Sequence, residues 1–110
     1  MSYEPCYKTE DMNLLLDALL KLSTRDEALR LLDDLCTVNE IQRMTQRIHV
    51  AKLLTNHVSY QIIKDKTGAS STTIGRVSKS LQYGSDGYAV VFGRMEEDPE
   101  YLRNWTMFRP

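Results

Sequence analysis

Small hydroxylated and cationic side chains gather in one short stretch of the chain. They are Ser70, Ser71, Thr72, Thr73, Arg76 and Lys79, and no carboxylate lies between them. Hydroxyl groups can bond base edges or phosphate oxygens, and an arginine can bond a guanine through two hydrogen bonds. This acid-free stretch could therefore contact DNA. The alternative is the polar, solvated face of an ordinary helical hairpin.

The residue types that usually carry catalysis or hold metals are not arranged for either task. His49 and His57 lie eight residues apart, whereas a zinc-binding helix spaces its histidines by four. Cys6 and Cys36 form no CxxC motif. The chain also has no Ser-His-Asp order, no glycine-rich phosphate loop and no paired inward carboxylates. We therefore expect no enzyme activity, no metal and no cofactor.

Two short predicted helices within residues 58–82 position the hydroxylated stretch. Ser59 can cap the first helix, and Gly68 stands just past its end, where a left-handed residue is favoured. Ser70 or Ser71 can cap the second helix. The residues spaced for inward faces are Ile62 and Ile63 on the first helix, and Ile74, Val77 and Leu81 on the second. Two helices joined by a glycine-containing turn are typical of a helix-turn-helix, whose second helix enters the major groove.

The charge of the chain divides along its length. The formal net charge is −1, but residues 35–82 hold seven basic and two acidic residues, a net +5. Residues 1–34 carry −4 and residues 83–110 carry −2. A cationic middle around a helix-turn-helix favours a basic face for nucleic acid. Chance clustering of charge is the alternative.

Four further helices are expected around the helix-turn-helix. One spans Asp11–Leu22, and a leucine-rich stripe along it is wider than one neighbouring helix can cover, so it is deeply buried or packs on a second chain. Thr24 with Glu27 forms a capping box that opens a helix through Leu35. A last helix, capped by Ser85 or Asp86, runs through Glu96.

The longest predicted helix spans Val38–Thr55. Thr37 and Glu40 form a capping box at its start. Its expected inward residues are Ile41, Met44, Ile48, Ala51 and Leu54, with Val50 and Leu53 at the margins and Lys52 outward or at an edge.

The chain ends are expected to lie outside one folded domain at residues 11–97. Residues 1–10 contain Pro5 and no periodicity, which predicts a flexible arm, and residues 98–110 form an apolar, aromatic tail. No apolar run approaches the roughly 18 residues of a membrane span, and no signal peptide opens the chain. We expect a cytoplasmic, nucleoid-associated protein without a membrane partner.

Short motifs between residues 33 and 84 carry a resemblance to a known family. They are Asp33–Ile41, Gln46-Arg47, Ala51–Leu54, Thr67–Ser70, Thr73–Val77 and Leu81–Gly84. They resemble the tryptophan-repressor family, most closely its repressor-like branch of the YerC/YecD type, over roughly Leu14 to Glu97. The resemblance implies an all-α, six-helix Trp-repressor-like fold and an intertwined homodimer. Its two reading heads would engage successive major grooves, ~34 Å apart.

The same resemblance bears on a small-molecule site. In the tryptophan repressor the bound amino acid wedges between core and reading head. Gln46, or Arg47 after a slip of one residue, matches the first arginine that stacks on the indole, and Arg76 matches the second. Ser80 matches the serine beside the ligand's amino end, but Val77 replaces the glycine that leaves space for the indole. We therefore predict no tryptophan response, and the corepressor, if one exists, is unknown.

Together these patterns predict a sequence-specific transcriptional regulator, a repressor, that binds double-stranded DNA as a homodimer. The expected phosphate contacts are Ser59, Lys64, Lys66, Arg76 and Lys79, and the expected base-edge contacts are Ser70, Ser71, Thr72, Thr73 and Arg76. Gly75 costs its helix about 1 kcal/mol against alanine, which we interpret as permission for close approach to DNA or to a neighbouring helix. The alternative function is a helical protein-interaction module that keeps the fold without specific DNA binding.

Overall fold

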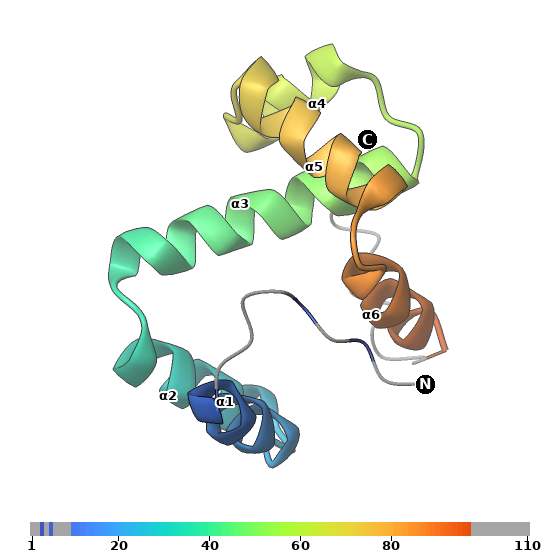
Figure 1. Ribbon diagram of the computed structural model, residues 1–110. Coiled ribbons are helices and arrows are strands. Elements are labelled where there is room, and N and C mark those ends of the chain that lie inside the picture. The colour runs from blue at the N-terminus through green and yellow to red at the C-terminus, as the bar shows by residue number, and fades with distance from the viewer. Residues whose placement is uncertain (1–2, 4, 6–9, 98–110) are drawn as a thin grey trace. The chain divides into compact units, whose positions relative to one another are not determined.

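Six α-helices make up the secondary structure of the computed structural model, which describes residues 3, 5 and 10–97 (Figure 1). They are α1 (Glu10–Leu20), α2 (Arg25–Leu35), α3 (Val38–Thr55), α4 (Tyr60–Thr67), α5 (Ser71–Tyr83) and α6 (Gly87–Met95). Within these residues there is no strand, so the all-α, six-helix prediction is confirmed. The aromatic tail and most of the expected arm lie outside the described residues.

The chain divides into two compact units, one up to Val38 and the other from Asn39. The first unit contains α1 and α2, and neither helix has a buried residue. Leu14 and Leu20 of α1 are 75% and 82% exposed, so the leucine-rich stripe is uncovered in the single chain. The second unit contains most of α3 and all of α4, α5 and α6. The expected single domain over residues 11–97 stays a prediction.

The start of α2 shows the predicted cap with one correction. The hydroxyl of Thr24 accepts a hydrogen bond from the backbone N–H of Glu27 at 3.1 Å. The Glu27 carboxylate accepts from the N–H of Ser23 at 2.8 Å, one residue before the N–H expected for a capping box. The Thr24 bond satisfies a backbone donor that the helix start would leave free, and the Glu27 bond satisfies the N–H of the residue before the cap.

The core of the second unit lies where α4, α5 and α6 meet the C-terminal half of α3 (Figure 1). Its members are Val50, Ala51, Leu53, Val58, Ile63, Ala69, Ile74, Val77 and Phe92. Val50 and Leu53 are fully buried, whereas Met44 and Ile48, which we expected to face inward, are exposed. The prediction for α3 was wrong in this respect, because within the second unit α4, α5 and α6 cover only its C-terminal half.

Lys52 corrects a second expectation about α3. It was predicted to face outward or lie at an edge, but it is 3% exposed. Its Nζ lies 3.4 Å from Oε1 of Glu96 and 4.9 Å from the ring centroid of Phe92. The aliphatic part of the side chain can pack in the core while the ammonium group meets α6. Lys52 therefore joins α3 to α6 and does not contribute to an exposed basic face.

The helix boundaries around the turn follow the predicted caps. The Ser59 hydroxyl accepts from the N–H of Ile62 at 3.4 Å, which confirms Ser59 as the cap of α4. Gly68 adopts φ +72°, and its N–H donates to the Lys64 carbonyl at 2.9 Å, so the left-handed end of α4 is confirmed. Ile62 is 41% exposed, so the expectation that it faces inward was wrong.

The remaining boundaries shift by a few residues from those predicted. α1 ends at Leu20 instead of Leu22, and α6 runs from Gly87 to Met95 instead of through Glu96. Asp86 stands at the start of α6 in the left-handed region, with φ +64°, and its side chain makes no capping hydrogen bond. None of the helices described here has the length and apolar character needed to cross a membrane.

Candidate nucleic-acid interface

The exposed face of α5 presents the hydroxylated and cationic side chains identified in the sequence. Ser70 caps this helix, so of the two predicted caps Ser70 is the correct one. Ile74 and Val77 are buried and fix the inner face of the helix. Thr72, Arg76 and Lys79 are exposed, and their spacing of four and three places them on one outward stripe.

Ser70 and Thr73 form a local hydrogen-bond pair at the start of α5. The Ser70 hydroxyl accepts from the Thr73 N–H at 3.1 Å and donates to the Thr73 hydroxyl, also at 3.1 Å. Thr73 is half-buried, whereas Ser70 and Ser71 are exposed. The structure therefore gives Ser70 and Thr73 a capping task in the free protein, while Ser71 and Thr72 lie open to solvent.

The candidate phosphate contacts on α4 are exposed. Lys64 and Lys66 lie in its last turn, and Ser59 caps its start. Burial, and to a lesser extent the charge of Lys66, lower the pKa of His49 on α3. Lys66 is therefore close enough to lower the pKa of the His49 imidazole, while its own side chain remains exposed.

Hydrogen bonds tie the turn between α4 and α5 to α3. The side-chain amide of Gln46 donates to the backbone carbonyl of Thr67 at 3.2 Å. The Thr67 hydroxyl donates to the carbonyl of Ile63 at 2.7 Å and accepts from the N–H of Ala69 at 3.1 Å. Because these bonds join α3, the end of α4 and the turn, α5 is held in a defined orientation on the second unit.

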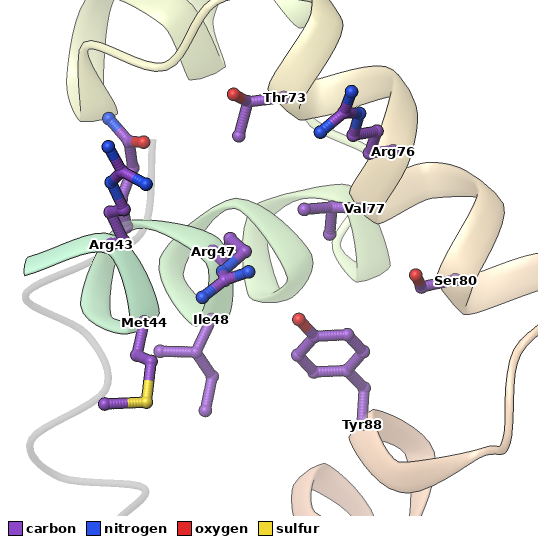
Figure 2. Close-up of a pocket in the computed structure, with 10 residues that line it drawn as sticks. Arg43, Met44, Arg47, Ile48, Thr73, Arg76, Val77, Ser80 and Tyr88 are labelled. Carbon is purple, nitrogen blue, oxygen red and sulfur yellow. The ribbon is translucent and has the colours of Figure 1, made fainter. Parts of the chain in front are cut away.

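A pocket of about 870 Å³ lies beside α5, between α3, α5 and α6 (Figure 2). Its lining residues are Arg43, Met44, Gln46, Arg47, Ile48, Thr73, Arg76, Val77, Ser80 and Tyr88. The four residues proposed from the sequence as ligand contacts, Gln46, Arg47, Arg76 and Ser80, all line it. Figure 2 shows the hydroxyl of Tyr88 directed into the space between α3 and α5.

Reasoning from the sequence missed part of the pocket. Arg43 precedes Arg47 by four residues, a spacing that places both on one face of α3 and could have identified Arg43. Tyr88 lies three and four residues before the apolar residues Val91 and Phe92 of α6, and its ring stacks on Phe92 with centroids 5.9 Å apart. Its hydroxyl nevertheless reaches the pocket, which the local pattern of α6 does not indicate.

Comparisons with known proteins agree with this architecture. The family model for the Trp repressor protein matches residues 10–96. The uncharacterized protein YerC of Bacillus subtilis (strain 168) is 41% identical over 88 residues, which cover 80% of this chain and 85% of that protein. Two solved structures each superpose with a TM-score of 0.78. One is a protein of the Trp repressor type from Staphylococcus aureus, 43% identical, with 83% of this chain and 91% of that chain covered. The other is a TrpR like protein from Eubacterium eligens ATCC 27750, 48% identical, with coverages of 81% and 92%.

Proposed function

The chain belongs to the Trp repressor family, and on that premise we propose that it is a sequence-specific DNA-binding transcriptional regulator that acts as a repressor. The observation that carries the proposal is the outward stripe of α5, where Thr72, Arg76 and Lys79 are exposed on a capped helix without a carboxylate. The family is one of regulators, so the proposed activity is binding and not catalysis.

The proposed DNA contacts fall into two groups. Lys64, Lys66 and Lys79 would neutralise phosphates and position the duplex, together with free N–H groups at the start of α5. Thr72 and Arg76 would reach base edges in the major groove, and Arg76 can bond a guanine bidentately. Ser59, Ser70, Ser71 and Thr73 remain proposed contacts at the edges of this surface. Phosphate contacts set the strength of binding, whereas base contacts set its specificity.

A homodimer is proposed as the binding form. The exposed leucines of α1 support it, because an uncovered leucine-rich helix is stabilised when a second chain buries it. Two copies would also present two α5 helices to successive major grooves and double the positive charge facing the DNA. We place this regulator in the cytoplasm, associated with the nucleoid, and without a membrane partner.

The proposed regulator does not respond to tryptophan. Val77 lines the pocket and belongs to the core, so its branched side chain takes up space that a ring would need. In an ungapped alignment Gln46 stands at the position of one stacking arginine, and its amide is engaged with the Thr67 carbonyl, whereas a slip of one residue would place Arg47 there. An amide in that role offers no cation to stack on an indole.

The alternative function, a helical protein-interaction module, draws on the same exposed leucines of α1. A random-pool duplex selection, with and without tryptophan, separates the two functions. The proposed regulator should enrich one symmetric sequence in both pools. An interaction module should enrich none.

Substitutions then test the assignment of roles. Arg76→Ala should reduce the difference in binding free energy between the selected duplex and random DNA by about 1–3 kcal/mol, because it removes a side chain that hydrogen-bonds a base. Lys64→Ala should weaken both duplexes alike. Equal losses on both duplexes for Arg76→Ala would show that Arg76 does not read bases.

A further inference from the structure

The end of α4 has a hydrogen-bond partner on α3. Thr67 is the last residue of α4, and its carbonyl is one of the last four of the helix, which lack a partner within it. The side-chain amide of Gln46 donates to this carbonyl at 3.2 Å, across 21 positions of the sequence. Both residues are half-buried, and a hydrogen bond in such surroundings is electrostatically stronger than one in open water.

The Thr67 side chain extends this attachment into the turn between α4 and α5. Its hydroxyl donates to the Ile63 carbonyl at 2.7 Å and accepts from the Ala69 N–H at 3.1 Å. Ala69 is buried, and a buried backbone N–H needs a partner. The next residue is Ser70, the cap of α5. A series of hydrogen bonds therefore links α3 to the point at which α5 begins.

The core beneath the turn is apolar and defines its position less sharply. Ile63 of α4 and Ile74 of α5 belong to one buried cluster with Val50 and Leu53 of α3. Hydrophobic attraction has no preferred direction, whereas a hydrogen bond weakens steeply when its length or angle changes. The apolar contacts keep α4 and α5 on α3, and the amide of Gln46 adds a fixed point at the turn.

We propose that Gln46 is a positioning residue for DNA reading, whose amide holds the turn on α3 and thereby sets the direction in which α5 presents Thr72 and Arg76. The turn leads directly into Ser70, so a displaced turn moves the start of α5 and every side chain on its outward stripe. The inference rests on the proposed function, because it concerns the same surface of α5. Gln46 acts through the turn and contacts no base.

The positioning role concerns specificity more than overall affinity. Recognition groups have to be held within roughly 0.5 Å and 10–20° of the geometry in which they bind. Base-edge hydrogen bonds are sensitive to displacements of this size, because their strength depends on distance and angle. Attraction between lysines and phosphates acts over a longer range and tolerates such displacements. Loss of the Gln46 bond should therefore affect the selected duplex more than random DNA.

Amide hydrogen exchange without DNA tests whether Gln46 holds the turn. Gln46→Met keeps an unbranched, flexible side chain and removes the donor. The Ala69 N–H should then exchange about threefold faster or more, because the turn opens more often without its bond to α3. The Val90 N–H, bonded to the Asp86 carbonyl in α6, should keep its rate and is the internal reference. Gln42→Met, the same change at an exposed site one turn earlier on α3, should alter neither rate.

Duplex binding, followed by fluorescence anisotropy, tests the consequence for DNA reading. Gln46→Met should weaken binding to the selected duplex about tenfold, which corresponds to one good base contact. Binding to random DNA should fall less than about threefold, because the phosphate contacts remain. Gln42→Met should change neither affinity. Urea titration of both variants checks that they are folded under the conditions of the assay.

Thr67→Val and Thr67→Ser test the same attachment with the Gln46 donor left in place. Valine has the shape of threonine without the hydroxyl that accepts from the Ala69 N–H, whereas serine keeps that hydroxyl. Thr67→Ser should therefore bind the selected duplex about tenfold more tightly than Thr67→Val, with a smaller difference on random DNA. Equal binding by the two variants would show that order in this turn does not affect reading.

Each readout can refute the positioning role. Unchanged exchange at Ala69 in Gln46→Met, or equal acceleration at Val90, would show that the bond does not hold the turn in particular. Weaker duplex binding with unchanged exchange would assign Gln46 to a direct DNA contact, and equal losses on both duplexes would remove its role in specificity. If Gln46→Met binds the selected duplex as the parent does, this inference fails while the DNA proposal stands. If the parent binds no duplex, the DNA proposal fails, and the exchange rates still decide whether Gln46 holds the turn.

Discussion

Gly75 allows a test in which stability and DNA binding are predicted to change in opposite directions. It lies within α5 beside Arg76, on the side of the helix that faces away from the core. A Cβ built at this position has no heavy atom within 4 Å apart from the helix's own nearby backbone. Packing against another helix of the described chain therefore does not explain this glycine, and we propose that it permits close approach to DNA.

Gly75→Ala should stabilise the free protein and weaken its complex with DNA. Alanine in a helix interior is favoured over glycine by about 1 kcal/mol, and the structure shows no clash to oppose that gain. A gain of that size raises the melting temperature by about 4 °C or more for a small domain. If the helix backbone lies against the groove, the added methyl should displace contacts worth about 1.4 kcal/mol, a tenfold loss of affinity.

Gly93→Ala is the matched control for this test. Gly93 is an exposed glycine within α6, and a Cβ there also meets nothing within 4 Å. It should give a similar rise in melting temperature with no change in DNA affinity. Urea titration and fluorescence anisotropy on the selected duplex measure the two quantities for both variants. If Gly75→Ala binds DNA as well as the parent does, α5 does not approach the duplex through this face.

Three further predictions concern the support of α5 and the core beneath it. Ser70→Ala should lower the free energy of unfolding by about 1 kcal/mol, measured by urea titration, because it removes the side-chain cap bonded to the Thr73 N–H. Burial, then the charge of Lys66, lower the pKa of His49 below the ordinary 6.5, so the unfolded chain takes up the proton first as the pH falls. Stability should therefore be full above pH 6.5 and decline between that value and the lower folded pKa, and urea titrations across this range should show a flatter profile for His49→Gln. Lys52→Met should leave the urea midpoint unchanged or raise it, because methionine fills similar space without burying a charge; a loss above about 2 kcal/mol would show that the charge stabilises the fold.

Local rules predicted the helix-turn-helix well because its signals are local. Ser59 and Gly68 act through backbone groups within four residues of themselves, and the structure places both as expected. The exposed stripe of α5 follows in the same way from Ile74 and Val77, whose burial fixes which side faces outward.

The errors arose where partners distant in the sequence decide the outcome. Val50 and Leu53 are buried in the core because α4, α5 and α6 cover the C-terminal half of α3 and leave the other half uncovered by them. The sequence of α3 alone does not indicate which half is covered. Lys52 is buried because Glu96 and Phe92 approach it from α6. The pocket likewise combines three helices, so its residues on α3 and α5 could be proposed singly from the sequence while its cationic character emerged only when they were brought together.

The central proposal is that the protein binds duplex DNA through phosphate and base contacts made by α5. A salt titration of duplex binding, followed by fluorescence anisotropy, tests it most directly. The logarithm of the association constant should fall linearly with the logarithm of salt concentration, by about 0.9 for each phosphate neutralised. Absence of detectable binding at about 50 mM salt, or affinity that does not change with salt, would contradict the proposal.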